Sequence, residues 1–185
     1  MSVNPSIFQS KQNMIVNERD CRHEQALHVG RQMMIAARTA PKGKGMDIIE
    51  IVLIEGEEIK LLSDTMLALA AENGLKFFLR DATTILSAEC IVLIGTHEET
   101  HGLNCGHCGY DTCGERKEGV PCAINAIDVG IAIGSACATA ADCRVDTRVM
   151  FSAGLAAQRL NWLQGCKMVM AIPVCATSKN PFFDR

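Results

Sequence analysis

The sequence lacks the excess of basic charge that binding to a nucleic acid or to an anionic membrane requires. Its 185 residues include 18 Lys and Arg against 21 Asp and Glu, so the formal net charge is −3. Such a balance provides no electrostatic footprint for a polyanion. We therefore expect neither a nucleic acid nor a membrane as a partner.

The chain also lacks a charged and then apolar leader, because residues 1–17 are mixed and polar. Its most apolar stretch, Ala123–Ala141, is interrupted by four polar residues, which are Asn125, Asp128, Ser135 and Thr139. This stretch therefore predicts a buried central helix rather than a membrane span. Ten cysteines without a leader are typical of the reducing cytoplasm. Cysteine is therefore expected to bind metal or to pack in the core.

No His, Asp or Glu stands in a recognisable catalytic spacing, so the sequence predicts no catalytic residue. One polar loop, residues 96–104, carries His97, Glu98, Glu99 and His101. Imidazole and carboxylate groups suit several divalent ions. A second metal site and an ordinary solvated loop are both compatible with this pattern.

One stretch, residues 105–122, dominates the chemistry and is called the cysteine segment below. It contains four cysteines, which are Cys105, Cys108, Cys113 and Cys122. Four thiolates are what a [4Fe-4S] cluster or a structural zinc ion requires. The glycines between them, Gly106, Gly109, Gly114 and Gly119, allow the backbone to curl closely around an inorganic centre.

The spacing of these cysteines favours iron–sulfur over zinc. Structural zinc sites usually have two short cysteine pairs, whereas this segment has one short pair followed by two longer gaps. Zinc, and a loop of disulfide-bonded or free thiols, remain alternatives. Four other cysteines lie in apolar surroundings and are predicted to pack as small hydrophobic residues; they are Cys90, Cys137, Cys166 and Cys175.

The pattern of apolar residues predicts alternating strands and helices without a long linker. Strands are expected at 48–54, 90–95 and 167–174, and helices at 21–37, 59–73, 77–87, 123–141 and 151–163. This alternation predicts a single α/β or α+β domain over residues 1–185. The cysteine segment is inserted between the second strand and the central helix.

A second motif, Arg38–Gly45, is called the basic loop below. It places Arg38, Lys42 and Lys44 around Pro41 and two glycines. Cations and free backbone amides in such a loop can hold a phosphate group. A solvated turn is the alternative.

These motifs carry a resemblance to known proteins. Residues 36–41, followed by a glycine loop and a strand, resemble the start of the nitroreductase family, in which an Ala-Pro-Ser-type turn lies against the flavin. Residues 126–132 resemble the start of that family's central helix. With the cysteine segment inserted, the chain from about Cys21 to Arg185 resembles a family of small prokaryotic proteins described as containing a ferredoxin domain. The resemblance implies an α+β nitroreductase-like sheet flanked by helices.

The resemblance also implies cofactors, partners and site residues. It implies FMN beside the basic loop, with Lys179 or Arg185 on the phosphate, and a homodimer that builds the flavin site across its interface; the loop residues concerned are Arg38, Thr39, Pro41, Lys42 and Gly43. The doubled arginine with which many nitroreductases hold the flavin phosphate is not evident. Electrons would pass between cluster and flavin, and on to a small acceptor or a redox partner protein. A ferredoxin-like carrier without flavin and a zinc-stapled structural protein are the alternatives.

Overall fold

The computed structural model describes residues 15–183, which form a four-stranded sheet with helices on both faces. The helices are α1 (Glu18–Thr39), α2 (Glu57–Asn73), α3 (Lys76–Ile85), α4 (Ala123–Asp142) and α5 (Phe151–Arg159). The strands are β1 (Ile49–Ile54), β2 (Cys90–His97), β3 (Asp146–Thr147) and β4 (Cys166–Cys175). Two 3-10 turns occupy Gly43–Gly45 and Cys113–Glu115.

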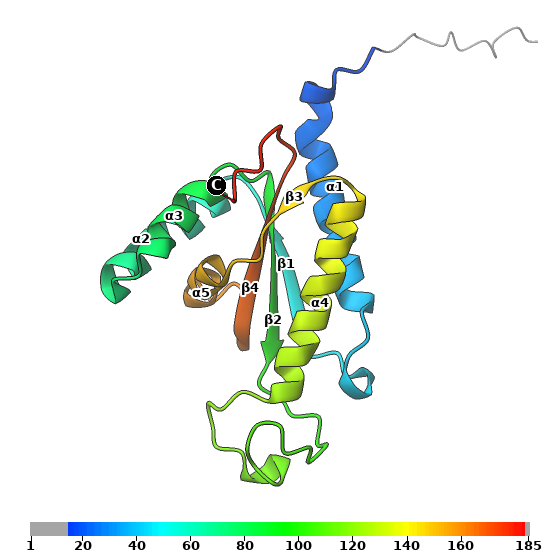
Figure 1. Ribbon diagram of the computed structural model, residues 1–185, viewed down its shortest axis with the longest axis vertical. Coiled ribbons are helices and arrows are strands. Elements are labelled where there is room, and N and C mark those ends of the chain that lie inside the picture. The colour runs from blue at the N-terminus through cyan, green and yellow to red at the C-terminus, as the bar shows by residue number, and fades with distance from the viewer. Residues whose placement is uncertain (1–14, 184–185) are drawn as a thin grey trace, which may run out of the picture.

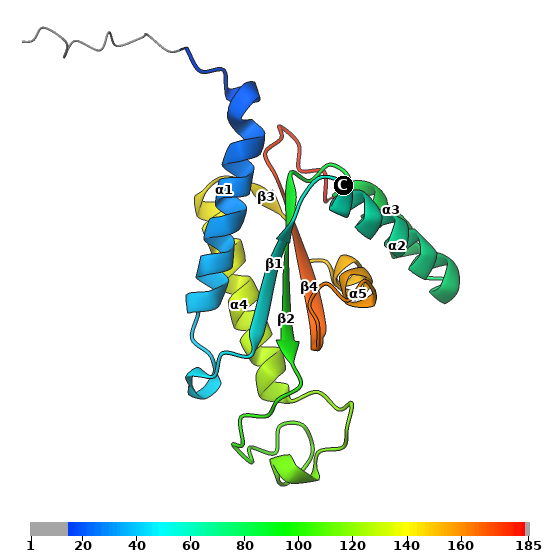
Figure 2. The ribbon, with the colours of Figure 1, turned by 180° about the vertical axis from the view of Figure 1, so that it is seen from behind.

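The strands pair antiparallel in the order β1-β2-β4-β3. Helices α1 and α4 cover one face of the sheet, and α2, α3 and α5 cover the other, as Figures 1 and 2 show from opposite sides. The predicted α+β architecture of a central sheet flanked by helices is confirmed.

Strand β2 lies at the centre of both cores. Its side chains alternate between the two faces, because successive residues of a strand point in opposite directions. Ile91 and Leu93 join the core under α2, α3 and α5, whereas Val92 and Ile94 join the core under α1 and α4. Burial on both faces explains why this strand is a continuous apolar run.

Local sequence accounts for the ends of the helices. The Asn17 side chain accepts a hydrogen bond from the Arg19 amide and caps α1. Gly74 ends α2 in the left-handed conformation, as its position just after Asn73 predicts. Helix α5 ends at Arg159, before the predicted end, and Asn161 has a positive φ of 56°. The short strand β3 was not predicted from the sequence.

The prediction that the apolar helix 123–141 lies at the centre of the fold is wrong for a single chain. Helix α4 is long and apolar enough to cross a membrane, yet only 33% of its most apolar 18-residue window is buried inside the protein. Its inner side packs on α1 and β2 through Ala132, Ala136 and Ala140. Its outer side leaves Ile127 and Ile131 exposed by 49% and 38%.

Candidate metal centre and the neighbouring basic loop

The cysteine segment projects beyond the end of the sheet, between β2 and α4 (Figure 1). Asn125, in the first turn of α4, holds the residues that lead from β2 into the cysteine segment. Its Nδ2 donates to the His97 and Glu99 carbonyls at 3.0 and 2.6 Å. Arg116 donates to the carbonyls of Glu98, at 2.8 Å, and of Val120. The segment is therefore anchored at its base.

Asn104 and Cys113 shape the interior of this loop. The Asn104 amide donates to Cys113 Sγ at 3.4 Å, and the Cys113 amide donates to Asn104 Oδ1 at 2.8 Å. Asn104, Gly106 and Gly109 have positive φ angles of 48°, 72° and 86°, which curl the backbone as glycine permits. An amide that donates to a ligand sulfur is one of the contacts that set the potential of an iron–sulfur cluster.

The four candidate ligands differ in exposure. Cys105 is exposed, Cys108 and Cys113 are half-buried, and Cys122 is buried. Cys122 occupies the N-cap position of α4, and its side chain makes no capping hydrogen bond. Within residues 15–183, no group of three or more His, Cys, Asp or Glu side chains is arranged to hold a metal ion. The donor set suits a four-thiolate centre, but in the described residues the four thiols are not gathered into one site.

The basic loop begins in the last turn of α1 and leads to β1, and its predicted cations already have protein acceptors. Arg38 Nη1 contacts the Asp47 carboxylate and donates to the Ile49 carbonyl at 2.5 Å. Lys42 Nζ donates to carbonyls at the end of α1, including that of Ala37 at 2.8 Å. Burial lowers the pKa of Lys42.

Thr39 also serves the helix, because its hydroxyl donates to the Ile35 carbonyl at 3.0 Å. Lys44 Nζ donates to the His101 carbonyl at 2.9 Å, which links the basic loop to the approach of the cysteine segment. Pro41 follows Ala40, whose ψ of 134° ends the helix. Most of the loop's polar groups are therefore engaged within the chain.

A buried pair that the sequence did not predict lies between the two motifs. Asp128, in α4, accepts hydrogen bonds from the Gly43 amide at 3.0 and 3.2 Å. Its Oδ2 also lies 2.9 Å from His101 Nε2, and both side chains are almost completely buried. The sequence offered two signals for Asp128: it is a carboxylate in a mostly apolar helix, and it lies in the stretch 126–132 that resembles the start of the nitroreductase central helix.

The two histidines considered for a second metal site contact different carboxylates. His97 Nε2 lies 3.3 Å from the Glu50 carboxylate, whereas His101 points to Asp128. Glu98 and Glu99 are exposed. The structure does not gather these four residues into one site.

Lys179, one of the two predicted phosphate partners, lies far from the basic loop. Lys179 follows the C-terminal end of β4, whereas the basic loop precedes the start of β1. In the antiparallel register, β1 begins opposite Thr96 and β4 ends opposite Cys90, so the two sites lie at opposite ends of the sheet. Arg185 lies outside the described residues.

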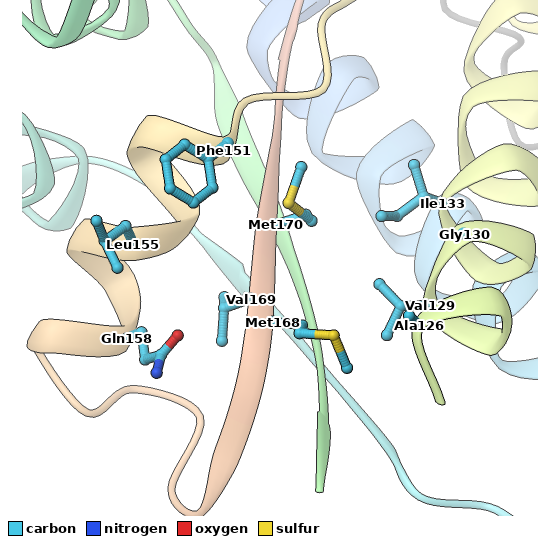
Figure 3. Close-up of a pocket in the computed structure, with 10 residues that line it drawn as sticks. All are labelled: Ala126, Val129, Gly130, Ile133, Phe151, Leu155, Gln158, Met168, Val169 and Met170. Carbon is cyan, nitrogen blue, oxygen red and sulfur yellow. The ribbon is translucent and has the colours of Figure 1, made fainter. Parts of the chain in front are cut away.

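An apolar groove of about 350 Å³ opens between α4 and α5 over β4. Figure 3 shows Ile133 and Val129 on one wall, Phe151 and Leu155 on the other, and Met170 on the floor. Residues 166–170 of β4 pair with β2 alone, because β3 pairs only with Val174 and Cys175, and the nearby Met150 bridge is to Ala171. Apolar surface and an open strand edge therefore coincide here.

The fold is that of nitroreductases. An oxidoreductase containing FMN matches 96% of this chain and 84% of its own, at 13% identity and a TM-score of 0.58. A putative nitroreductase in complex with FMN from Desulfovibrio desulfuricans matches 94% and 82%, at 13% identity and a TM-score of 0.56. A nitroreductase with bound FMN from Desulfitobacterium hafniense matches 94% and 86%, at 14% identity and a TM-score of 0.55.

Sequence comparison identifies the family within this fold. An uncharacterised protein of Archaeoglobus fulgidus is 40% identical over 182 residues, which span 93% of this chain and 98% of that protein. Residues 118–185 match the family described as uncharacterised proteins containing a ferredoxin domain. The chain belongs to this family. The ferredoxin domain in the family's description supports a redox role with an iron–sulfur centre.

Proposed function

We propose that the chain is a redox protein that carries a [4Fe-4S] cluster on Cys105, Cys108, Cys113 and Cys122. The observation that supports this most is the Asn104–Cys113 exchange of hydrogen bonds, in which an amide already donates to a candidate ligand sulfur. Closure of the other thiols around the metal would couple metal binding to ordering of the loop. The exposed Cys105 side gives a redox partner access.

We further propose FMN as the second cofactor, in a homodimer. A bound cluster exchanges single electrons, and a flavin converts them into two-electron chemistry on a small acceptor. Within one chain, the eight residues of β2 separate the basic loop from Lys179 by about 25 Å, at about 3.3 Å per residue. Only a second subunit could bring Lys179 close to the basic loop.

The groove between α4 and α5 supports the dimer. Its apolar walls continue into the exposed side of α4, where Gly130 and Gly134 would allow a close approach. An open edge of β4 borders the same surface. Exposed apolar patches of this kind mark interaction sites.

One observation favours a second candidate, a ferredoxin-like carrier without flavin. Arg38 and Lys42 already have acceptors inside the chain, so fewer charges of the basic loop remain for a flavin. Replacing Arg38 by Ala separates the two functions. We expect the variant to lose FMN but to keep iron, and unchanged flavin content would exclude this role of Arg38.

The decisive experiment is analysis of iron, acid-labile sulfide, zinc and flavin in protein purified without oxygen, with an absorption spectrum. Iron and sulfide near four per chain, together with FMN, are the expected result. Iron without flavin identifies the carrier. Zinc without iron identifies the zinc-stapled protein and contradicts the proposal.

Cysteine variants test whether the cluster is bound by the cysteine segment. The double variant Cys105→Ser and Cys108→Ser should lose the iron, because a four-thiolate centre cannot close on two sulfurs. Cys143→Ser is the matched control, since Cys143 is also exposed but lies at the far end of α4. Equal iron in both proteins would contradict the assignment.

A further inference from the structure

Asp128 touches both motifs of the proposed redox site. Its carboxylate accepts from the Gly43 amide of the basic loop, and its Oδ2 lies 2.9 Å from His101 Nε2, in the approach to the cysteine segment. Lys44 Nζ, in the basic loop, also donates to the His101 carbonyl at 2.9 Å. Three parts of the chain that are remote in sequence therefore meet at one carboxylate.

The packing at this point leaves little freedom. A Cβ atom on Gly43 would lie 2.9 Å from Ile124 Cγ2 and 3.3 Å from His101 Cε1, so a larger residue would require the Ile124 side chain to shift. Both the Asp128 and the His101 side chains are no more than 2% exposed. A carboxylate at such depth depends on hydrogen-bond partners within the protein, because water does not reach it.

The His101 side of the contact is close but incomplete. Both ring nitrogens are buried and lack an aligned hydrogen-bond partner, although Nε2 is within contact distance of Asp128. The Gly43 side, in contrast, has well-formed hydrogen bonds. The imidazole can therefore improve its contact with Asp128 by a small movement of the segment that carries it.

We propose that Asp128 is a positioning residue that couples the basic loop to the cysteine segment through His101. Ordering of the cysteine segment around its metal aligns His101 on Asp128, and the same carboxylate holds the Gly43 turn. Loading of one motif then orders the other. The loading step rests on the function proposed above, whereas the positioning by Asp128 does not.

Hydrogen exchange of the full chain as purified tests the positioning. In Asp128→Asn we expect amide exchange about tenfold faster, both at 42–46 and at 99–104, because each segment loses a buried charged partner. The matched control is Asp142→Asn, at the exposed end of the same helix, which should change neither segment. Faster exchange in only one segment, or in neither, overturns the proposal.

Reconstitution with iron and sulfide tests the coupling. In the wild-type chain, loading should slow exchange at 42–46, and Asp128→Asn should abolish this effect while it keeps its iron. A loop that still responds in Asp128→Asn overturns the coupling. If the wild-type chain binds no iron, the proposed function fails, while the exchange in the purified protein still decides the role of Asp128.

His101→Gln is the second variant, in case Asp128→Asn does not fold. It keeps the Gly43–Asp128 bonds and removes only the imidazole. We expect faster exchange at 99–104, an unchanged Gly43 amide, and loss of the response of the basic loop to iron. A full response in His101→Gln overturns the route through His101.

Discussion

Cys90, Cys166 and Cys175 are core residues outside the cysteine segment. Each is buried in a strand, and burial raises their pKa values to about 12, 11 and 11. A raised pKa keeps the thiol protonated and unreactive. The prediction that these cysteines pack as small hydrophobic residues agrees with their positions in the two cores.

Alkylation measures this difference residue by residue. With iodoacetamide at pH 8, we expect the three core thiols to react about a hundredfold more slowly than the exposed Cys143. Because the folded pKa values are raised, their reaction should accelerate only as the pH approaches 11 to 12. Peptide mass spectrometry gives the rates, and unfolded protein is the control in which all four should react alike. Equal rates in the native protein would contradict the assignment.

Other features at the residue scale were beyond prediction from the sequence. The cysteine spacing indicates a metal segment because its ligands are local in sequence. The Asp128–His101 contact joins a helix to a distant loop, and no spacing rule relates the two positions. The sequence left phosphate binding and a solvated turn open for the basic loop, and the structure gives Arg38 and Lys42 acceptors within the chain.

At the scale of elements, apolar periodicity predicts most helices and strands correctly, since each buries one or two continuous apolar faces. The two-residue strand β3 has too little pattern to be recognised. Helix α4 was recognised as a helix, but its depth was not, because composition alone does not say whether an apolar face meets the same chain or another one. Close approaches between elements likewise depend on the packed structure.

Helix α5 provides a sharp test of such an approach. A Cβ atom on Gly154 would lie 2.0 Å from the Val169 carbonyl oxygen of β4, so Gly154→Ala must push the helix off the strand. We expect a loss of about 3 kcal/mol in the free energy of unfolding, as for other overpacked cores. Urea denaturation followed by circular dichroism measures it.

The matched substitution is Gly114→Ala, where an added Cβ meets nothing within 4 Å. It should leave the unfolding midpoint of the metal-free chain nearly unchanged. A Gly154→Ala protein as stable as this control would show that α5 and β4 do not approach as described.

At the scale of the whole molecule, the proposed dimer makes a separate prediction. Ile131→Glu places a charge on the exposed side of α4 and should convert a dimer into a monomer, because a buried unpaired carboxylate is costly. Analytical ultracentrifugation measures the mass. Leu61→Glu, on α2 at the opposite face and exposed by 48%, is the control and should remain dimeric. A wild-type monomer would contradict the cross-subunit flavin site.

The anchoring of the cysteine segment keeps its two ends close together. Asn125 binds the His97 and Glu99 carbonyls, so the chain leaves and re-enters the scaffold at neighbouring points. A short turn could close the same gap without repacking either core. The segment is thus attached to the scaffold at one place, and a change in its length should leave the packing of both cores unchanged.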